Sequence, residues 1–253
     1  MASSLPFAGL DGCHGGWVCA RWDGAGALEL SRLARVEDLF ADGQGPEIAA
    51  IDIPIGLSER TGLGGRAPER LVRPLLGMRQ SSVFSVPPRA AVMAGGGTDG
   101  DEGERYRKAC AASRAASEPS RAVSKQCFHI FPKILQVDEV LRREPQLRGR
   151  LLECHPEVSF RTMQGAPLLT PKKVKGRVWP EGLAARIALL AAQGMPTELL
   201  RRETAVRLKA GLDDVIDACA CAWTARRIAR GEAVSYPDPP HQDAYGLPVA
   251  IRA

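Results

Sequence analysis

The hydrophobic positions at the start of the chain form short runs separated by glycine-rich turns. Phe7 to Leu10 is an apolar run that ends at Asp11, and the glycines that follow supply a tight turn, since glycine takes positive φ without steric cost. Residues 17–22 and 27–33 continue as two further strands. The pattern predicts an antiparallel meander of three strands.

Two later apolar runs extend this sheet. After a short helical segment at residues 36–41, residues 48–53 form a largely apolar strand of the kind that is covered on both faces in a parallel sheet. Leu151 to Cys154 has the pattern of a fifth strand. We therefore predict an α/β protein with a mixed five-stranded sheet flanked by helices, in which the first, fourth and fifth strands are parallel.

Between the fourth and fifth strands the pattern changes to helices and loops. A single domain over residues 1–253 with a helical insertion at about 58–150 fits this change. The further predicted elements are helices at 68–76, 102–116 and 124–143 (broken near Pro132), a flexible loop at 94–101, helices at 180–193 and 212–230, and an extended strap from Ser235 onward.

Composition narrows the class of protein without identifying it. The 253 residues are 45% hydrophobic and 25% charged, which excludes a collagen, a coiled coil and a wholly disordered chain. No apolar run approaches the roughly 18 to 20 residues of a membrane helix, and no secretory signal is visible. Seven cysteines without a paired framework favour free thiols and a cytoplasmic location. A net charge of +5 is compatible with an anionic partner but does not require one.

Acidic residues follow three of the predicted strands and one helix start. Asp11 and Asp52 each close an apolar strand, and the carboxyl ends of parallel strands meet at one edge of an open sheet. Glu157 follows the fifth strand. Asp214 and Asp217 are three residues apart on a predicted helix and therefore share a face. We expect these side chains to gather at the same edge.

Gathered carboxylates repel each other unless a cation compensates their charge. Oxygen ligands suit Mg²⁺ or Mn²⁺, and two such ions roughly 3.5–4 Å apart can activate water and stabilise the leaving oxygen of a phosphodiester. The hypothesis is a two-metal nuclease with Asp11, Asp52, Asp214 and Asp217 as ligands and Glu157 as a further catalytic group. The alternative at each position is a turn cap or a helix N-terminal charge.

Several longer motifs resemble one bacterial family, domain of unknown function 429, which is described as predicted nucleases of RNase H-like fold. The resemblance implies that fold and implies nuclease activity. It runs from residue 9 to about residue 218. The motifs that carry it are Gly9-Leu10-Asp11-Gly12-Cys13-His14-Gly15-Gly16-Trp17, residues 51–57, residues 75–84, Ser124-Lys125-Gln126, residues 153–160 and residues 213–218.

The carboxylate layout resembles that of RuvC-type junction resolvases, which carry an acid on strand one, another on strand four and a pair three apart on the last helix. This chain departs from the resolvases in two ways: Asp52 stands where they usually have Glu, and they lack the helical insertion. Lys172 and Lys173 agree with the family pattern, but Val174-Lys175-Gly176 departs from its usual continuation.

Cations and hydroxyls near these motifs are candidates for holding phosphate, a task that suits the planar fork of arginine. Solvated helix faces and a self-contained turn are the alternatives. We expect DNA or RNA as partner and no membrane, and a homodimer is left open. The candidate substrate-binding residues are Arg79, Ser81, Ser82, Lys125, Lys172 and Lys173.

Two other function classes remain at this point. A non-catalytic nucleic-acid or protein-binding module could keep the fold without turnover, because errors near 1 Å in site geometry abolish rate. An actin-like or sugar-kinase-like phosphotransferase would open with an Asp-Gly-rich hairpin such as Asp11 to Trp17. That class requires a second such hairpin downstream, and the sequence contains none.

Overall fold

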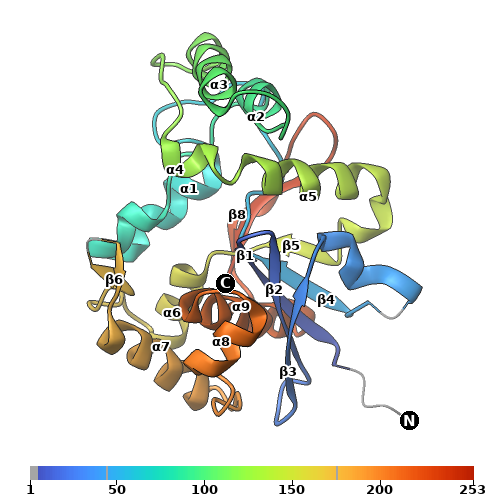
Figure 1. Ribbon diagram of the computed structural model, residues 1–253, viewed down its shortest axis with the longest axis vertical. Coiled ribbons are helices and arrows are strands. Elements are labelled where there is room, and N and C mark those ends of the chain that lie inside the picture. Colours follow the sequence, from blue (N-terminus) through green and yellow to red (C-terminus); the bar gives the residue numbers. More distant parts are fainter. Residues whose placement is uncertain (1–4, 44, 175) are drawn as a thin grey trace.

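A five-stranded sheet lies at the centre of the computed structural model, which describes residues 5–43, 45–174 and 176–253 (Figure 1). Its strand order is β3-β2-β1-β4-β5. The strands are β1 (Phe7–Cys13), β2 (Gly16–Trp22), β3 (Leu28–Leu33), β4 (Ile48–Ile51) and β5 (Leu151–Glu153).

The strand directions confirm the predicted mixed sheet. β1 pairs antiparallel with β2, and β2 pairs antiparallel with β3, which is the meander. β1 pairs parallel with β4, and β4 pairs parallel with β5. This order and these directions are those of an RNase H-like α/β fold. The carboxyl ends of β1, β4 and β5 therefore meet at one edge of the sheet.

Alternation along β1 separates its two faces. Ala8 and Leu10 pack in one core cluster together with Phe131 and other residues of α5 (Phe131–Arg143). Gly9 and Asp11 have the opposite parity and therefore point to the other face, since successive side chains alternate across a strand. That second face is covered by α9 (Leu212–Ala229), the helix that carries the predicted acidic pair.

The approach of α9 to β1 is close enough to exclude a side chain. A Cβ atom built on Gly9 would lie 2.0 Å from the carbonyl oxygen of Ala218 and 2.1 Å from the amide nitrogen of Ala222. The helix surface here consists of the small buried residues Ala218 to Ala222. The absence of a side chain at Gly9 thus sets the spacing between helix and strand.

The insertion between β4 and β5 is helical, as predicted. Most of it stands apart from the sheet, and α5 returns across one sheet face (Figure 1). The predicted helix at 124–143 is broken near Pro132, as expected: α4 ends at Phe128 and α5 begins at Phe131, so that Pro132 sits in the first turn of α5. The other elements here are α1 (Ala67–Val72), η2 (Arg73–Ser82), α2 (Arg89–Gly95), α3 (Glu102–Ala116), α4 (Lys125–Phe128) and η3 (Pro145–Leu147).

Some elements differ from the sequence prediction. The expected loop at 94–101 begins inside α2, and the expected strap from Ser235 is a hairpin of β8 (Ser235–Gln242) and β9 (Pro248–Arg252). Its prolines lie on a strand with a single partner, where missing N–H donors are tolerated. The remaining elements are η1 (Val36–Gly43), α6 (Pro156–Gln164), β6 (Lys173–Val174), β7 (Arg177–Val178), α7 (Pro180–Ala192) and α8 (Arg202–Leu208).

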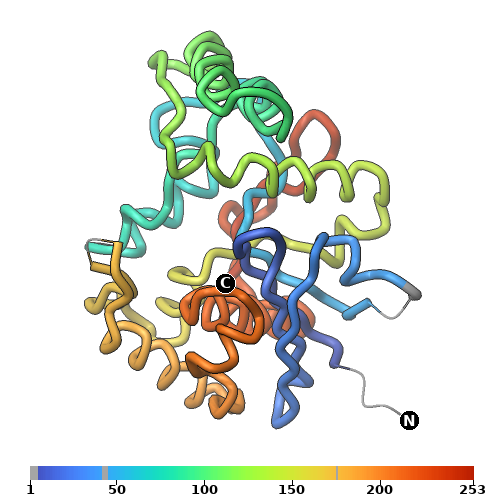
Figure 2. The backbone as a smooth tube through the Cα atoms, in the orientation of Figure 1, coloured from blue at the N-terminus to red at the C-terminus, as the bar shows by residue number. Residues whose placement is uncertain are grey.

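A buried arginine joins the insertion to the C-terminal hairpin. Arg89 on α2 donates two hydrogen bonds to Asp138 of α5, at 2.8 and 3.0 Å, and a third to Asp243, at 2.7 Å. Figure 2 shows the hairpin loop, in red, beside α5. Because these carboxylates hold one guanidinium between them, the hairpin and the insertion are fixed together.

In the described part of the chain, none of the helices combines the length and the apolar character that a bilayer crossing requires.

The close contact at Gly9 predicts that a larger residue there destabilises the fold. Gly9→Ala places a methyl group against helix backbone that cannot rotate away, so we expect a loss of about 3 kcal/mol or more in the free energy of unfolding, measured in urea. Gly26→Ala is the control, because nothing lies within 4 Å of a Cβ atom at that turn position. Equal stability of the two variants would contradict the close contact.

Candidate active site

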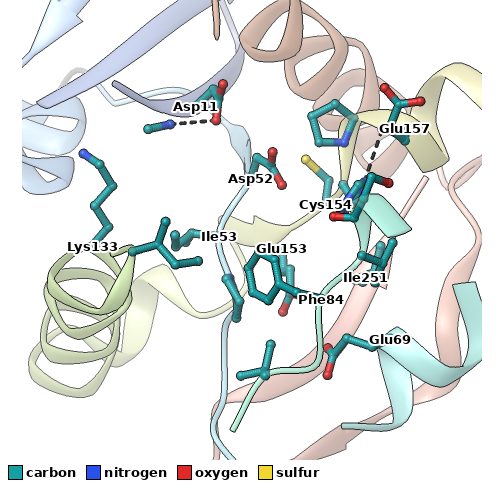
Figure 3. Close-up of a pocket in the computed structure, with 18 of the residues that line it drawn as sticks. Asp11, Asp52, Ile53, Glu69, Phe84, Lys133, Glu153, Cys154, Glu157 and Ile251 are labelled. Carbon is teal, nitrogen blue, oxygen red and sulfur yellow. Dashed lines mark hydrogen bonds between the residues drawn. The ribbon is translucent and has the colours of Figure 1, made fainter. Parts of the chain in front are cut away.

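Asp11 and Asp52 are among the carboxylates that line one cavity at the carboxyl edge of the sheet. Asp11 lies near the end of β1, and Asp52 directly follows β4. Figure 3 shows both at one side of a cavity of about 260 Å³, which Lys172 also lines. Asp217 of α9 lies near them: its Oδ2 binds the Nζ of Lys172, and its charge acts on Asp11. The structure thus brings together the first, fourth and last-helix positions of the predicted carboxylate set.

Ionising these carboxylates costs free energy, because burial raises the pKa of each of them. Burial and then the neighbouring charges of Asp52 and Asp217 raise the pKa of Asp11 well above its usual value. Burial is also the main reason why the pKa of Asp217 is raised to about 6, against the opposing effect of Lys172. The pKa of Asp52 is raised by burial as well, although His155 and Lys172 lower it. All three groups favour a bound cation or proton.

Lys172 supplies one positive charge to this cluster. Burial alone would lower its pKa, but the carboxylates of Asp217 and Asp11 outweigh burial and raise it, so the ammonium stays charged. The Oδ1 atom of Asp217 is buried and has no hydrogen-bond partner, although its Oδ2 is bound by Lys172. One carboxylate oxygen therefore remains available to a ligand.

The two neighbouring aspartates of α9 have other partners. Asp214 is half-buried, and its Oδ2 accepts a hydrogen bond of 2.9 Å from the amide of Gly211, which caps the helix. Burial raises the pKa of Asp214. Asp213 forms an ion pair of 2.5 Å with the exposed Lys173. Asp214 therefore contributes charge near the cluster while it also satisfies the start of α9.

Glu157 lines the cavity, but its carboxylate is held by another element. Arg186 of α7 is fully buried and donates to both carboxylate oxygens of Glu157, at distances of 2.6 to 3.1 Å. Such a bidentate pair fixes the orientation of both groups. The structure accordingly gives Glu157 a partner that the sequence analysis did not identify.

The donor set fits a hard divalent ion by its chemistry. Asp11, Asp52 and Asp217 offer carboxylate oxygens, the ligands that Mg²⁺ and Mn²⁺ accept, and the unpartnered Oδ1 of Asp217 is one of them. Within residues 5–43, 45–174 and 176–253, however, no group of three or more His, Cys, Asp or Glu side chains is arranged to hold a metal ion. Lys172 stands as the counter-charge in the arrangement shown.

The predicted substrate-binding residues are divided between the cavity and the surface. Ser82 lines the cavity, and its hydroxyl donates to the carbonyl of Arg79 at 2.8 Å. Arg79 is half-buried, whereas Ser81 is exposed at the end of η2. Lys125 is exposed at the start of α4 with its Nζ 4.1 Å from the centre of the Tyr106 ring, outside the residues that line the cavity.

His155 contacts both Ser82 and Glu157. It precedes α6, where its Nδ1 accepts a hydrogen bond of 3.3 Å from the amide of Glu157. That bond leaves the proton on Nε2, which lies 3.4 Å from the carbonyl oxygen of Ser82. His155 therefore caps a helix and lines the cavity with the same ring.

Sequence reasoning missed Lys133, which lines the cavity from α5. Its Nζ donates to the carbonyl of Gly16 at 2.5 Å and lies 4.4 Å from the centre of the Trp17 ring. Burial lowers its pKa. The signal that could have pointed to it is Gly12, because a Cβ there would lie 2.8 Å from the Lys133 side chain. From the sequence alone, a lysine in an amphipathic helix cannot be recognised as a residue that lines a cavity.

A second missed group is a buried network at the far end of the cavity. All five guanidinium N–H groups of Arg66 are used: Nε and Nη2 donate to Glu69, Nη2 also to Glu153, and Nη1 to two carbonyls. Glu153 also accepts from the amide of Ile55 at 2.7 Å. Burial raises the pKa of Glu153 to about 7 in spite of Arg66. This network fixes the floor of the cavity.

Comparison with known proteins gives a family and nothing more specific. A family model described as "Protein of unknown function (DUF429)" matches residues 9–242. No curated protein and no solved structure matches the chain.

The raised pKa of Asp11 predicts a pH-dependent cost. Because folded Asp11 binds its proton more tightly than the unfolded chain does, the free energy of unfolding falls as pH rises above about 4. Asp11→Asn keeps an oxygen for the Gly12 amide and removes this cost. We expect the variant to melt about 2–8 °C above the wild type at pH 8 in EDTA, and by much less at pH 5.

Glu29→Gln is the matched control, because it removes a carboxylate that is exposed on β3. A lower melting temperature for Asp11→Asn than for the wild type at both pH values would contradict the electrostatic account.

The Glu157–Arg186 pair predicts a structural loss. Glu157→Gln leaves a fully buried guanidinium without its anion, so we expect about 3–5 kcal/mol less free energy of unfolding in urea. Glu181→Gln removes an exposed carboxylate from the same helix as Arg186 and serves as control. A stable Glu157→Gln protein would show that the carboxylate is free for another task.

Proposed function

The chain belongs to the DUF429 family, and we propose that it is a metal-dependent nuclease that hydrolyses phosphodiester bonds of nucleic acid. The proposal rests on the carboxylates of Asp11, Asp52 and Asp217 and on the cavity that Asp11 and Asp52 border; Lys172, which also lines the cavity, connects it to Asp217. Asp214, one turn before Asp217 on α9, adds negative charge to the same edge.

The observation that carries the proposal is an excess of negative charge. Fully ionised, Asp11, Asp52 and Asp217 carry two more charges than Lys172 offsets, which is the charge of one divalent cation. The buried Glu157, by contrast, has a dedicated arginine in Arg186. A buried cluster that is left short of positive charge is characteristic of a site that works with a ligand.

In this proposal Asp11, Asp52 and Asp217 hold Mg²⁺ or Mn²⁺, with Asp214 and phosphate oxygens available to a second ion. The bound ions supply a water nucleophile of lowered pKa and neutralise charge on the leaving oxygen. Lys172, which lines the cavity, would hold a phosphate oxygen of the substrate, and Lys133 lines the same cavity from α5. Burial of Asp11 and Asp217 excludes bulk water and strengthens these interactions.

One observation favours a second candidate, a non-catalytic nucleic-acid-binding module. The ammonium of Lys172 already contacts Asp217, so the acids are partly neutralised without a metal ion. In a module that has lost turnover, this contact would be the permanent state. The two candidates differ in whether a divalent ion displaces Lys172.

We further propose a cytoplasmic location with DNA or RNA as the partner. All seven cysteines are free, buried thiols, which suits a reducing compartment.

The nuclease proposal predicts Mn²⁺-dependent cleavage of at least one substrate in a mixed panel of single-stranded, duplex and branched DNA and RNA. Asp11→Asn and Asp217→Asn should each lower the rate at least about 100-fold, because each removes a charged oxygen ligand. Cleavage is followed on labelled oligonucleotides in gels, and metal binding by isothermal titration calorimetry.

Asp99→Asn is the control, since it makes the same chemical change on an exposed loop and should leave the rate unchanged. Equal residual cleavage in wild type and Asp11→Asn would identify a contaminant and end the nuclease proposal. Nucleic-acid binding without cleavage or metal uptake would establish the binding module instead.

A further inference from the structure

The cavity contains a part that the proposed chemistry does not use. Beyond Asp11 and Asp52 the wall of the cavity is apolar. Such a wall offers no ligands to a metal ion and no hydrogen bonds to a phosphate group. In Figure 3 the ring of Phe84 lies between Ile53 and Ile251, on the far side of Asp52 from Asp11. The apolar lining residues are Ile53, Val83, Phe84, Val86, Ile130 and Ile251.

The size of the cavity limits its occupant. Its volume is about 260 Å³, whereas a closed apolar cavity of about 150 Å³ holds one benzene molecule. Because this volume also includes the acidic edge, the apolar part has room for at most one flat group of one or two rings. The whole volume is below the roughly 300–1,000 Å³ of sites for larger ligands. A stacked base pair cannot enter a space of this size.

The floor of the cavity selects for hydrogen-bond donors. Arg66 has no N–H left to offer, since all five are used within the protein. The carboxylates of Glu69 and Glu153 accept three and two hydrogen bonds respectively, whereas a carboxylate has about four acceptor positions. What remains at this end is acceptor capacity. An occupant should therefore present a donor such as an amino group.

The cavity thus combines the ring of Phe84, room for about one nucleotide, and hydrogen-bond acceptors on Glu69 and Glu153. These features lie next to the acidic edge at which we place the phosphate. Proteins read single unstacked bases by stacking on an aromatic side chain and by hydrogen bonds to the base edge. We propose that the apolar part of the cavity binds an amino-bearing nucleobase, that of adenine, cytosine or guanine, stacked on Phe84 with its amino group toward Glu69 and Glu153.

This inference deepens the proposed nuclease function and rests on it for the place of the phosphate. With the base in this pocket, the phosphate of the same nucleotide lies toward Asp11 and Asp52. The preferred substrate is then a terminal or unpaired nucleotide of a strand, because a base inside a continuous duplex would first have to be unstacked and unpaired at a cost in free energy.

The test is isothermal titration calorimetry at pH 8 in Mg²⁺ with AMP, UMP and ribose 5-phosphate, which has no base. We expect AMP to bind at least about tenfold more tightly than ribose 5-phosphate and severalfold more tightly than UMP. Phe84→Leu should weaken AMP about tenfold and leave ribose 5-phosphate unchanged.

Phe40→Leu is the matched control. Phe40 is also a half-buried phenylalanine packed against the same core cluster, but it does not line the cavity, so its loss should change none of the three affinities. Phe84→Leu that weakens AMP and ribose 5-phosphate equally would show a general distortion and overturn the base assignment. No binding of AMP, or equal binding of AMP, UMP and ribose 5-phosphate, would overturn it as well.

The two proposals can fail separately. Mn²⁺-dependent cleavage that is lost in Asp11→Asn, combined with base-independent nucleotide binding, leaves the nuclease standing and removes the base pocket. Base-dependent binding of AMP without cleavage of any substrate leaves the pocket and removes the nuclease.

Discussion

The distance between α9 and β1 decides whether this protein has a site at all. Asp11 and Asp217 belong to elements almost the whole chain apart, and they meet because Gly9 lets the helix backbone rest on the strand. Any side chain at Gly9 would push α9 away from β1. Asp217 would then move away from the carboxyl edge of the sheet, where Asp52 lies. A packing constraint in the core thus sets the electrostatics of the cavity.

The molecule treats its buried acids in two ways. Glu157 has Arg186 to itself, whereas Glu69 and Glu153 share the one guanidinium of Arg66, and these contacts hold the wall and the floor of the cavity in place. Among the described residues, Lys172 is the lysine bound to the acids at the sheet edge, and the Oδ1 of Asp217 keeps no hydrogen-bond partner. The contrast distinguishes the closed Glu157–Arg186 pair from acids that keep acceptor atoms for a ligand.

The sheet, its strand directions and the insertion were predictable because they depend on local patterns: alternation, glycine turns and apolar runs. The meeting of Asp11 with Asp52 followed from topology alone. The contacts of Arg66 and Arg186 were not predictable, since an arginine in a helix has the same sequence signature whether it is buried against a distant acid or exposed. Phe84 and Ile251 come from separate loop and hairpin segments, so only the folded chain places them on one wall. The C-terminal hairpin was missed because its prolines suggested an unpaired segment.

The junction made by Arg89 makes the cavity dependent on the C-terminal hairpin. Asp243 lies beyond every other element that borders the cavity except β9, and Arg89 joins it to Asp138 of α5. Ile251, on β9, supplies part of the cavity wall. Until β9 has folded onto the rest of the chain, the cavity lacks Ile251 and therefore part of one wall. The pocket is thus completed by a strand about 200 residues beyond the segment that carries Ile53 to the same wall, so its formation depends on long-range contacts and not on the sheet alone.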